Sequence, residues 1–139
     1  MKTTGTHKGL YTQAEKDAIG LAVVCDLLSR HSNAGKKQPC FVRFEGKDPP
    51  EDVLTTLTKI YPRVRAASQA EWREATGRDR VGSYRGLMFS VGRINAVSRT
   101  EVTVMGDWDG GPFGRAYYDY TVRFIDGQWQ PVVASVRRC

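Results

Sequence analysis

Apolar and polar residues alternate along the last third of the chain. From Tyr118 to Phe124 every second residue is apolar or aromatic, whereas Asp119 and Arg123 lie between them. Because the side chains of a strand point alternately to its two faces, this period of two predicts a strand over Tyr117–Ile125 with the aromatic face in the core. Asp119 is then expected to face solvent, where a carboxylate gains little as a general base.

Turn signals place this strand in a longer series. Asp126-Gly127 supplies the positive φ angles of a two-residue hairpin turn, so the strands on either side should pair antiparallel. A further turn is expected near Asn95–Ser98. The resulting meander has four strands, at Leu87–Ile94, Glu101–Met105, Tyr117–Ile125 and Trp129–Val136.

The first part of the chain has helical periodicity. Thr12 and Glu15 match a capping box, and apolar residues follow at helical spacing as far as Leu28, which predicts a helix that starts at Thr12. Asn33-Ala34-Gly35 should end it. His31 is expected to cap this end or to face solvent, because no second base or metal ligand lies near it in the sequence.

Shorter elements follow. Cys40–Phe44 has the residue types of a strand. Asp48-Pro49-Pro50 predicts the start of a second helix with Asp48 as its cap, and Pro62 should end that helix. Val64–Ala67 is expected to add an edge strand. Thr76–Gly86 is rich in Gly and Arg and is predicted to be a mobile loop.

These elements predict the α+β class, with N-terminal helices packed on a curved antiparallel sheet that ends in the four-strand meander. The 139 residues are sufficient for a single domain, 1–139, in which residues 1–10 form a flexible tail. No apolar run approaches the ~20 residues that span a bilayer, so no membrane partner is expected. The N-terminus lacks the apolar core of a signal peptide, which predicts a cytoplasmic protein; a trimmed secreted protein remains an alternative.

Charge is unevenly distributed. The formal net charge is +6, and residues 63–99 hold eight arginines against three acidic residues. Arginine suits phosphate and carboxylate recognition, although a solvated basic surface explains the same composition. The residues proposed for binding an anion or a partner are Arg73, Arg78, Arg80, Arg85, Trp108 and Arg115.

The segment Gly106–Arg115 is predicted to be a long loop between two strands. Its glycines would allow backbone amides to approach an anion, and Asp107 with Asp109 could bind a hard cation. The spacing matches neither a calcium loop, nor a P-loop, nor a dinucleotide-binding turn. A structural loop is therefore favoured, and no metal or cofactor is predicted.

Three cysteines lack the paired short spacing of metal or redox motifs. Cys25 lies in the apolar stretch of the first helix and is expected to be a core residue. Free thiols are favoured, while a bridge between Cys40 and Cys139 stays open.

The ending Tyr120-Thr121-Val122-Arg123-Phe124-Ile125-Asp126-Gly127-Gln128-Trp129 resembles the endings of nuclear-transport-factor-2-like and cystatin-like domains. The resemblance covers about the last 55 residues and implies a cone-shaped α+β roll. Enzymes of that superfamily use an Asp or His with a Tyr inside the cone. Such a set cannot be placed here residue by residue, since neither His lies on a predicted strand.

Three functions are consistent with these features. The leading hypothesis is a non-catalytic domain that binds a protein partner or a small or anionic ligand. The alternative is a small enzyme of the isomerase or hydro-lyase type, with Tyr84, Asp119 or Asp109 as acid–base groups. The third is nucleic-acid binding through the arginines. An exposed strand at the edge of the meander would also allow a homodimer.

Overall fold

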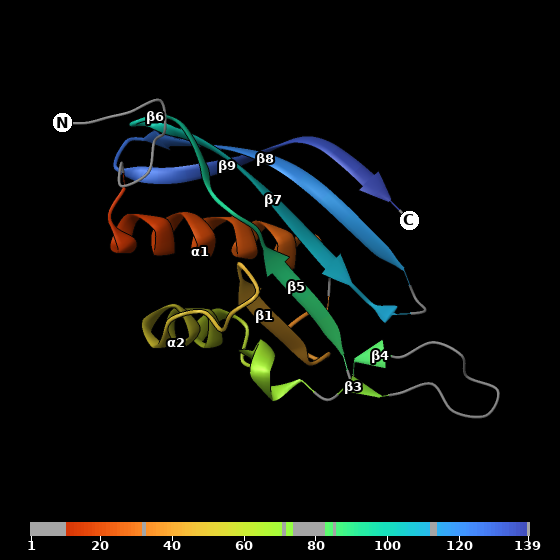
Figure 1. The fold of residues 1–139 in the computed structure, drawn as a ribbon. Helices are drawn as coiled ribbons and strands as arrows, with labels where there is room; N and C mark the ends of the chain where they lie inside the picture. The colour runs from red at the N-terminus through yellow and green to blue at the C-terminus, as the bar shows by residue number, and fades with distance from the viewer. Residues whose placement is uncertain are drawn as a thin grey trace.

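The computed structural model describes residues 11–31, 33–70, 72–73, 83–84, 86–111 and 114–138. The predicted tail, residues 1–10, and most of the predicted loop Thr76–Gly86 lie outside them. The described part contains two α-helices on one side of a seven-stranded sheet, which makes the fold α+β (Figure 1). The helices are α1 (Gln13–Ser29) and α2 (Glu51–Ile60), and the short 3-10 turn η1 spans Ala67–Gln69.

The sheet is mixed and open. Its strands are β1 (Cys40–Phe44), β2 (Val64–Ala66), β5 (Leu87–Val91), β6 (Asn95–Ser98), β7 (Glu101–Asp109), β8 (Arg115–Ile125) and β9 (Gln128–Arg138). They lie in the order β2-β1-β5-β7-β8-β9, with β6 paired to β7. Two short strands, β3 (Trp72–Arg73) and β4 (Ser83–Tyr84), form a separate pair.

The predicted meander is confirmed as β5-β7-β8-β9, but the expectation of a wholly antiparallel sheet is wrong. β1 pairs in parallel with both β2 and β5. The chain leaves β1, forms α2 and returns as β2, and a helical crossover of this kind joins parallel strands. The predicted edge strand is β2, one residue shorter than expected.

α1 begins at its predicted cap. The Thr12 hydroxyl accepts a hydrogen bond from the Glu15 amide at 3.1 Å, and the Glu15 carboxylate accepts one from the Thr12 amide at 2.9 Å. Tyr11, just before the cap, donates its hydroxyl hydrogen to the Ser98 carbonyl and packs edge-on against Trp129. These contacts fix the start of the helix beneath the β6–β7 turn and β9.

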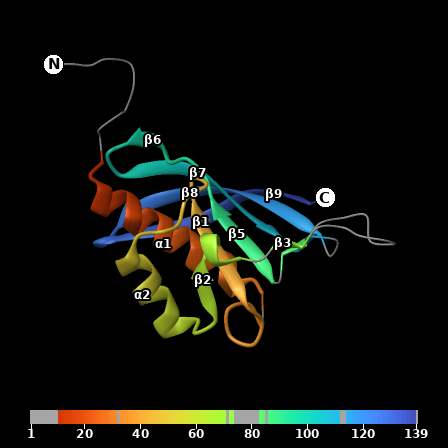
Figure 2. The same cartoon turned by 60° about the horizontal axis from the view of Figure 1, so that its bottom comes forward.

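The core lies between α1 and the inner face of the sheet (Figures 1 and 2). Its largest fully buried side chains include Ile19, Val23, Val24, Leu27 and Leu28 of α1, and Val42, Phe89, Val102, Tyr120 and Val122 of the sheet. Gly106 allows this close approach, because a Cβ there would lie 2.8 Å from Leu27 Cδ1 and 3.2 Å from the Tyr120 ring. α2 packs beside α1 and β2.

Two loop predictions are wrong. Asn95–Ser98, predicted as a turn, is strand β6, and the reversal of the chain occurs after it, at residues 99–100. The predicted loop Gly106–Arg115 is strand at both ends, since β7 continues to Asp109 in register with β5 and β8, and β8 begins at Arg115. The glycine that suggested a loop here is a point of helix–sheet contact instead.

Three side chains also differ from expectation. Asp48 is not the cap of α2, which has Pro50 at that position; its carboxylate accepts hydrogen bonds from the Ser68 amide and hydroxyl. Phe124, expected in the core, is 44% exposed. It lies two residues past Val122, the last fully buried residue of β8, and packs on Trp129. The ring of His31 is half-buried rather than solvent-facing.

The hairpin turn is confirmed, with φ angles of 53° at Asp126 and 79° at Gly127. β9 follows it at one edge of the sheet, contains Pro131, and has an irregular register with β8 near Ala134.

Cys25 is half-buried against the core and Cys40 is fully buried; both are free, and burial raises the pKa of the Cys40 thiol to about 12. Cys139 lies outside the described residues.

Candidate functional site

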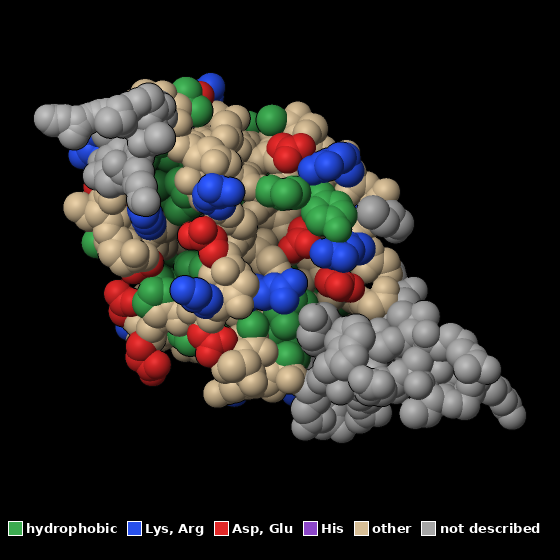
Figure 3. Space-filling view, in the orientation of Figure 1, with side chains coloured by type: hydrophobic (Ala, Val, Ile, Leu, Met, Phe, Trp, Pro, Cys, Tyr) green, Lys and Arg blue, Asp and Glu red, His purple; other side chains and the backbone are tan. Residues whose placement is uncertain are grey.

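The acidic residues predicted as acid–base groups lie on the outer face of the sheet, away from the helices. Asp119 accepts a hydrogen bond from the Ser135 hydroxyl at 2.6 Å and pairs with Arg137 at 3.5 Å. Asp109 accepts a hydrogen bond from the Gly111 amide at 2.8 Å. Figure 3 shows acidic, basic and hydrophobic side chains close together at its upper right, where β7 and β8 lie in the same view of Figure 1. Both carboxylates are therefore engaged with their neighbours.

Arg115 and Trp108, both predicted to bind a partner, lie on opposite faces. Arg115 pairs with the nearly buried Asp107 at 3.2 Å, and its guanidinium lies over the Tyr117 ring, which Arg137 approaches as well. Trp108 faces inward against His31, with ring centroids 4.9 Å apart. The two residues do not form a common site.

His31 is part of an aromatic cluster at the C-terminal end of α1. Its ring meets those of Phe89 and Trp108 edge-on, and its Nε2 is buried. Burial, and secondarily the charge of Arg138, lower the pKa of His31. The neutral imidazole is therefore a packing group.

The remaining predicted residues cannot be assigned contacts. Arg73 and Tyr84 lie on the paired strands β3 and β4, where only the backbone is described. Arg78, Arg80 and Arg85 lie outside the described residues. That the arginine-rich segment 63–99 forms a binding surface therefore stays a prediction.

The sequence analysis missed a carboxylate–tyrosine pair inside the fold. The Tyr120 hydroxyl donates a hydrogen bond of 2.6 Å to Asp26, which also accepts one of 2.8 Å from Arg30. Burial and then the Asp26 carboxylate raise the pKa of Tyr120. Tyr120 is 1% exposed, so this group joins α1 to β8. The available signal was an acidic residue between Cys25 and Leu27 on an otherwise apolar stretch.

A pocket lies where β1 and β5 end. Its volume is about 400 Å³, within the range of small-molecule sites. The lining residues are Gln13, Lys16, Asp17, Gly20, Phe44, Glu45, Lys47, Asp48, Pro50, Val91, Gly92 and Ile94. We call it the carboxyl-edge pocket, because the parallel strands β1 and β5 both point towards it. Ligands of α/β sheets commonly bind outside the carboxyl ends of parallel strands.

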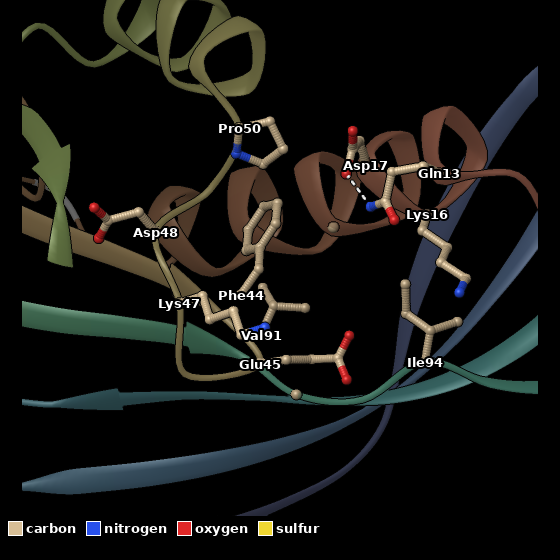
Figure 4. A pocket seen from close by; sticks show the side chains of 12 residues that line it. Gln13, Lys16, Asp17, Phe44, Glu45, Lys47, Asp48, Pro50, Val91 and Ile94 are labelled. Carbon is tan, nitrogen blue, oxygen red and sulfur yellow. Dashed lines mark hydrogen bonds between the residues drawn. The ribbon is translucent and has the colours of Figure 1, made fainter. Parts of the chain in front are cut away.

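The floor of this pocket is apolar. Phe44 and Val91 end the two parallel strands, and Ile94 comes from the segment that leads to β6 (Figure 4). Gly20 of α1 makes room for the Phe44 ring, since a Cβ at Gly20 would lie 2.7 Å from its nearest atom. An apolar group of a ligand could therefore contact Phe44 and Ile94.

Charged side chains surround this floor. Figure 4 shows Lys16 of α1 and Glu45 of the turn after β1 extending towards the pocket from different sides. Among the described residues neither forms an ion pair. Asp17 is instead held by a 2.9 Å hydrogen bond from Gln13, and Asp48 turns away to Ser68. Lys47, which also lines the pocket, forms no ion pair among the described residues either, so Lys16, Glu45 and Lys47 are available to a ligand.

The backbone holds Glu45 at the pocket. Phe44 and Lys47 exchange backbone hydrogen bonds of 2.7 and 3.0 Å around the two-residue turn Glu45-Gly46. The Glu45 amide also donates to the Val91 carbonyl at 2.7 Å, which ties the turn to the end of β5. Glu45 has φ 50°, a left-handed conformation that is unfavourable for a residue with a Cβ.

The described residues contain no group of three His, Cys, Asp or Glu side chains placed to hold a metal ion. None of their helices is long and apolar enough to cross a membrane. The fold and the pocket define a small α+β domain with an open mixed sheet and an amphipathic pocket. No family model, curated protein or solved structure matches the chain. The resemblance to nuclear-transport-factor-2-like and cystatin-like domains therefore stays a prediction.

Proposed function

We propose that this protein is a non-catalytic binding domain that holds a small molecule in the carboxyl-edge pocket. The observation that carries the proposal is the combination of an apolar floor with Lys16 and Glu45, two opposite charges that have no ion-pair partner among the described residues. Binding sites for small molecules are typically apolar hollows with a few placed polar groups. The carboxyl-edge pocket has such an apolar floor, although more of its lining side chains are polar or charged than apolar.

The same contacts support binding rather than catalysis. Asp119 is held by Ser135 and Arg137, and Asp109 by the Gly111 amide. In the Asp26–Tyr120 pair the tyrosine is buried and holds its proton tightly, and the partly exposed Asp26 accepts hydrogen bonds from Tyr120 and Arg30. A general acid or base must reach its substrate, and these groups are occupied by internal partners.

The proposal is tested by mapping amide chemical shifts of the ¹⁵N-labelled protein. The probes are the twenty amino acids, short dicarboxylic acids and nucleoside monophosphates, each added at millimolar concentration. We expect at least one probe to give saturable shifts at Lys16, Phe44, Glu45 and Ile94. The Lys16→Met variant should weaken that binding, whereas Arg123→Met, on the outer face of the sheet, should leave it unchanged. Shifts confined to the outer face, or no saturable shift with any probe, would overturn the proposal.

A further inference from the structure

We propose that the carboxyl-edge pocket selects a zwitterion with an apolar substituent, of the amino-acid type. Lys16 would bind the carboxylate and Glu45 the ammonium group, with the substituent on the floor formed by Phe44, Val91 and Ile94. This inference rests on the proposed function and adds the chemical class of the ligand.

The first argument is charge balance. Figure 4 shows an ammonium group, that of Lys16, and a carboxylate, that of Glu45, reaching towards one pocket from separate elements, α1 and the turn after β1. A ligand with a single negative charge would pair with Lys16 or with Lys47, the second lysine of the lining, but would be repelled by Glu45. A cation would pair with Glu45 and be repelled by both lysines. A zwitterion gives Glu45 and a lysine an opposite charge at the same time.

The second argument is the conformation of Glu45. A two-residue turn with positive φ at both positions favours Asn-Gly or Asp-Gly, and Gly46 follows the rule with φ 78°. Glu45 departs from it, because a Glu side chain is not among those that readily accept the left-handed conformation. Glu45 therefore places a long carboxylate at a position where a shorter side chain would be more stable. Residues in such strained backbone conformations cluster at ligand-binding sites.

The second hairpin turn of this kind provides a matched control. Asp126 has φ 53° and Gly127 has φ 79°, close to the values of 50° and 78° at Glu45 and Gly46. Asp126 joins β8 to β9 and is not among the residues that line the pocket. It also has a side chain of the favoured type, so Asp126→Asn removes a turn carboxylate outside the pocket without changing how well the residue fits the turn.

The probes are L-phenylalanine, N-acetyl-L-phenylalanine, which lacks the ammonium group, and L-phenylalanine amide, which lacks the carboxylate. Their affinities for the full chain are measured by titration of the pocket amides. We expect L-phenylalanine to bind about tenfold or more tightly than either analogue, since each analogue leaves one charged side chain without its partner.

The variants separate recognition from stability. Glu45→Asn should raise the Tm by a few degrees, weaken L-phenylalanine about tenfold or more and strengthen N-acetyl-L-phenylalanine, which the Glu45 carboxylate repels. Asp126→Asn should alter neither affinity nor Tm appreciably.

Each other outcome refutes a defined part of the argument. If N-acetyl-L-phenylalanine binds as tightly as L-phenylalanine, the zwitterion class is wrong while the pocket remains a small-molecule site. If Glu45→Asn lowers the Tm, the argument from the turn is wrong. If neither L-phenylalanine nor another apolar amino acid of the mapping panel binds at millimolar concentration, the proposed class is overturned; binding of a dicarboxylic acid or a nucleoside monophosphate would still support the proposed function.

Discussion

Replacement of Tyr120 by Phe should destabilise the protein by removing one hydrogen bond from its interior. The bond is 2.6 Å long and joins a hydroxyl on β8 to the Asp26 carboxylate on α1. Hydrogen bonds to charged groups contribute about 1.5–3 kcal/mol. The Asp26 side chain is 24% exposed and keeps its bond from Arg30, so it is not left without a partner. We therefore expect the lower part of that range, about 1.5–2 kcal/mol.

Urea unfolding at pH 7 measures this loss as a lower midpoint with an unchanged m-value. For a domain of this size the corresponding fall in Tm is roughly 5–8 °C. Tyr118→Phe is the matched control, because Tyr118 is also buried and its ring lies 6.2 Å from that of Tyr120, yet its hydroxyl forms no hydrogen bond with the described residues. Equal losses in the two variants would refute the reasoning.

The same pair predicts a dependence on alkaline pH. The pKa of Tyr120 is raised in the folded protein, so the folded state keeps a proton that the unfolded state loses above about pH 10. The stabilisation is complete below that pH and declines as the pH rises further. The difference in free energy of unfolding between wild type and Tyr120→Phe should accordingly narrow above pH 10. A constant difference would show that Tyr120 ionises normally.

Three further predictions address other parts of the fold. Gly106→Val should cost about 1–3 kcal/mol in urea unfolding, since the added side chain meets Leu27 and Tyr120, and a neutral result would show that α1 can shift. The pKa of His31 is lowered in the folded state, so stability should fall as the pH drops below the unfolded value of about 6.5; His31→Phe should reduce this loss between pH 7 and 5, and equal profiles would contradict it. If the arginine-rich segment binds nucleic acid, the affinity for a single-stranded oligonucleotide should fall steeply with salt and on replacing Arg78 and Arg80 by Gln; a flat response would remove that function.

Local signals in the sequence predicted the elements that depend on neighbouring residues. The Thr12–Glu15 capping box fixed the start of α1, and Asp126-Gly127 identified the last hairpin. The alternation around Tyr120 identified the buried face of β8. In each case the physical cause acts within a few residues, so the sequence pattern contains it.

The missed features depend on residues distant in the sequence. Gly106 suggested a loop, but its small size serves contact with α1, which only the packed structure shows. The pocket combines Lys16, Phe44 and Ile94 from three separate segments, and no short motif connects them. Asp26 and Tyr120 are 94 residues apart. Parallel pairing of β1 with β2 likewise arises from the return of the chain after α2 and not from strand composition.

The edge strand β9 limits how copies of this protein could join. An unpaired edge offers amides and carbonyls to another strand, and repeated addition of this kind leads to fibres. Pro131 has no amide to donate, and the irregular register near Ala134 interrupts the spacing of the free groups a few residues further on. A second strand would therefore find only short runs to pair with on either side of these points. A homodimer that formed through this edge would use a short contact that resists growth into a continuous sheet.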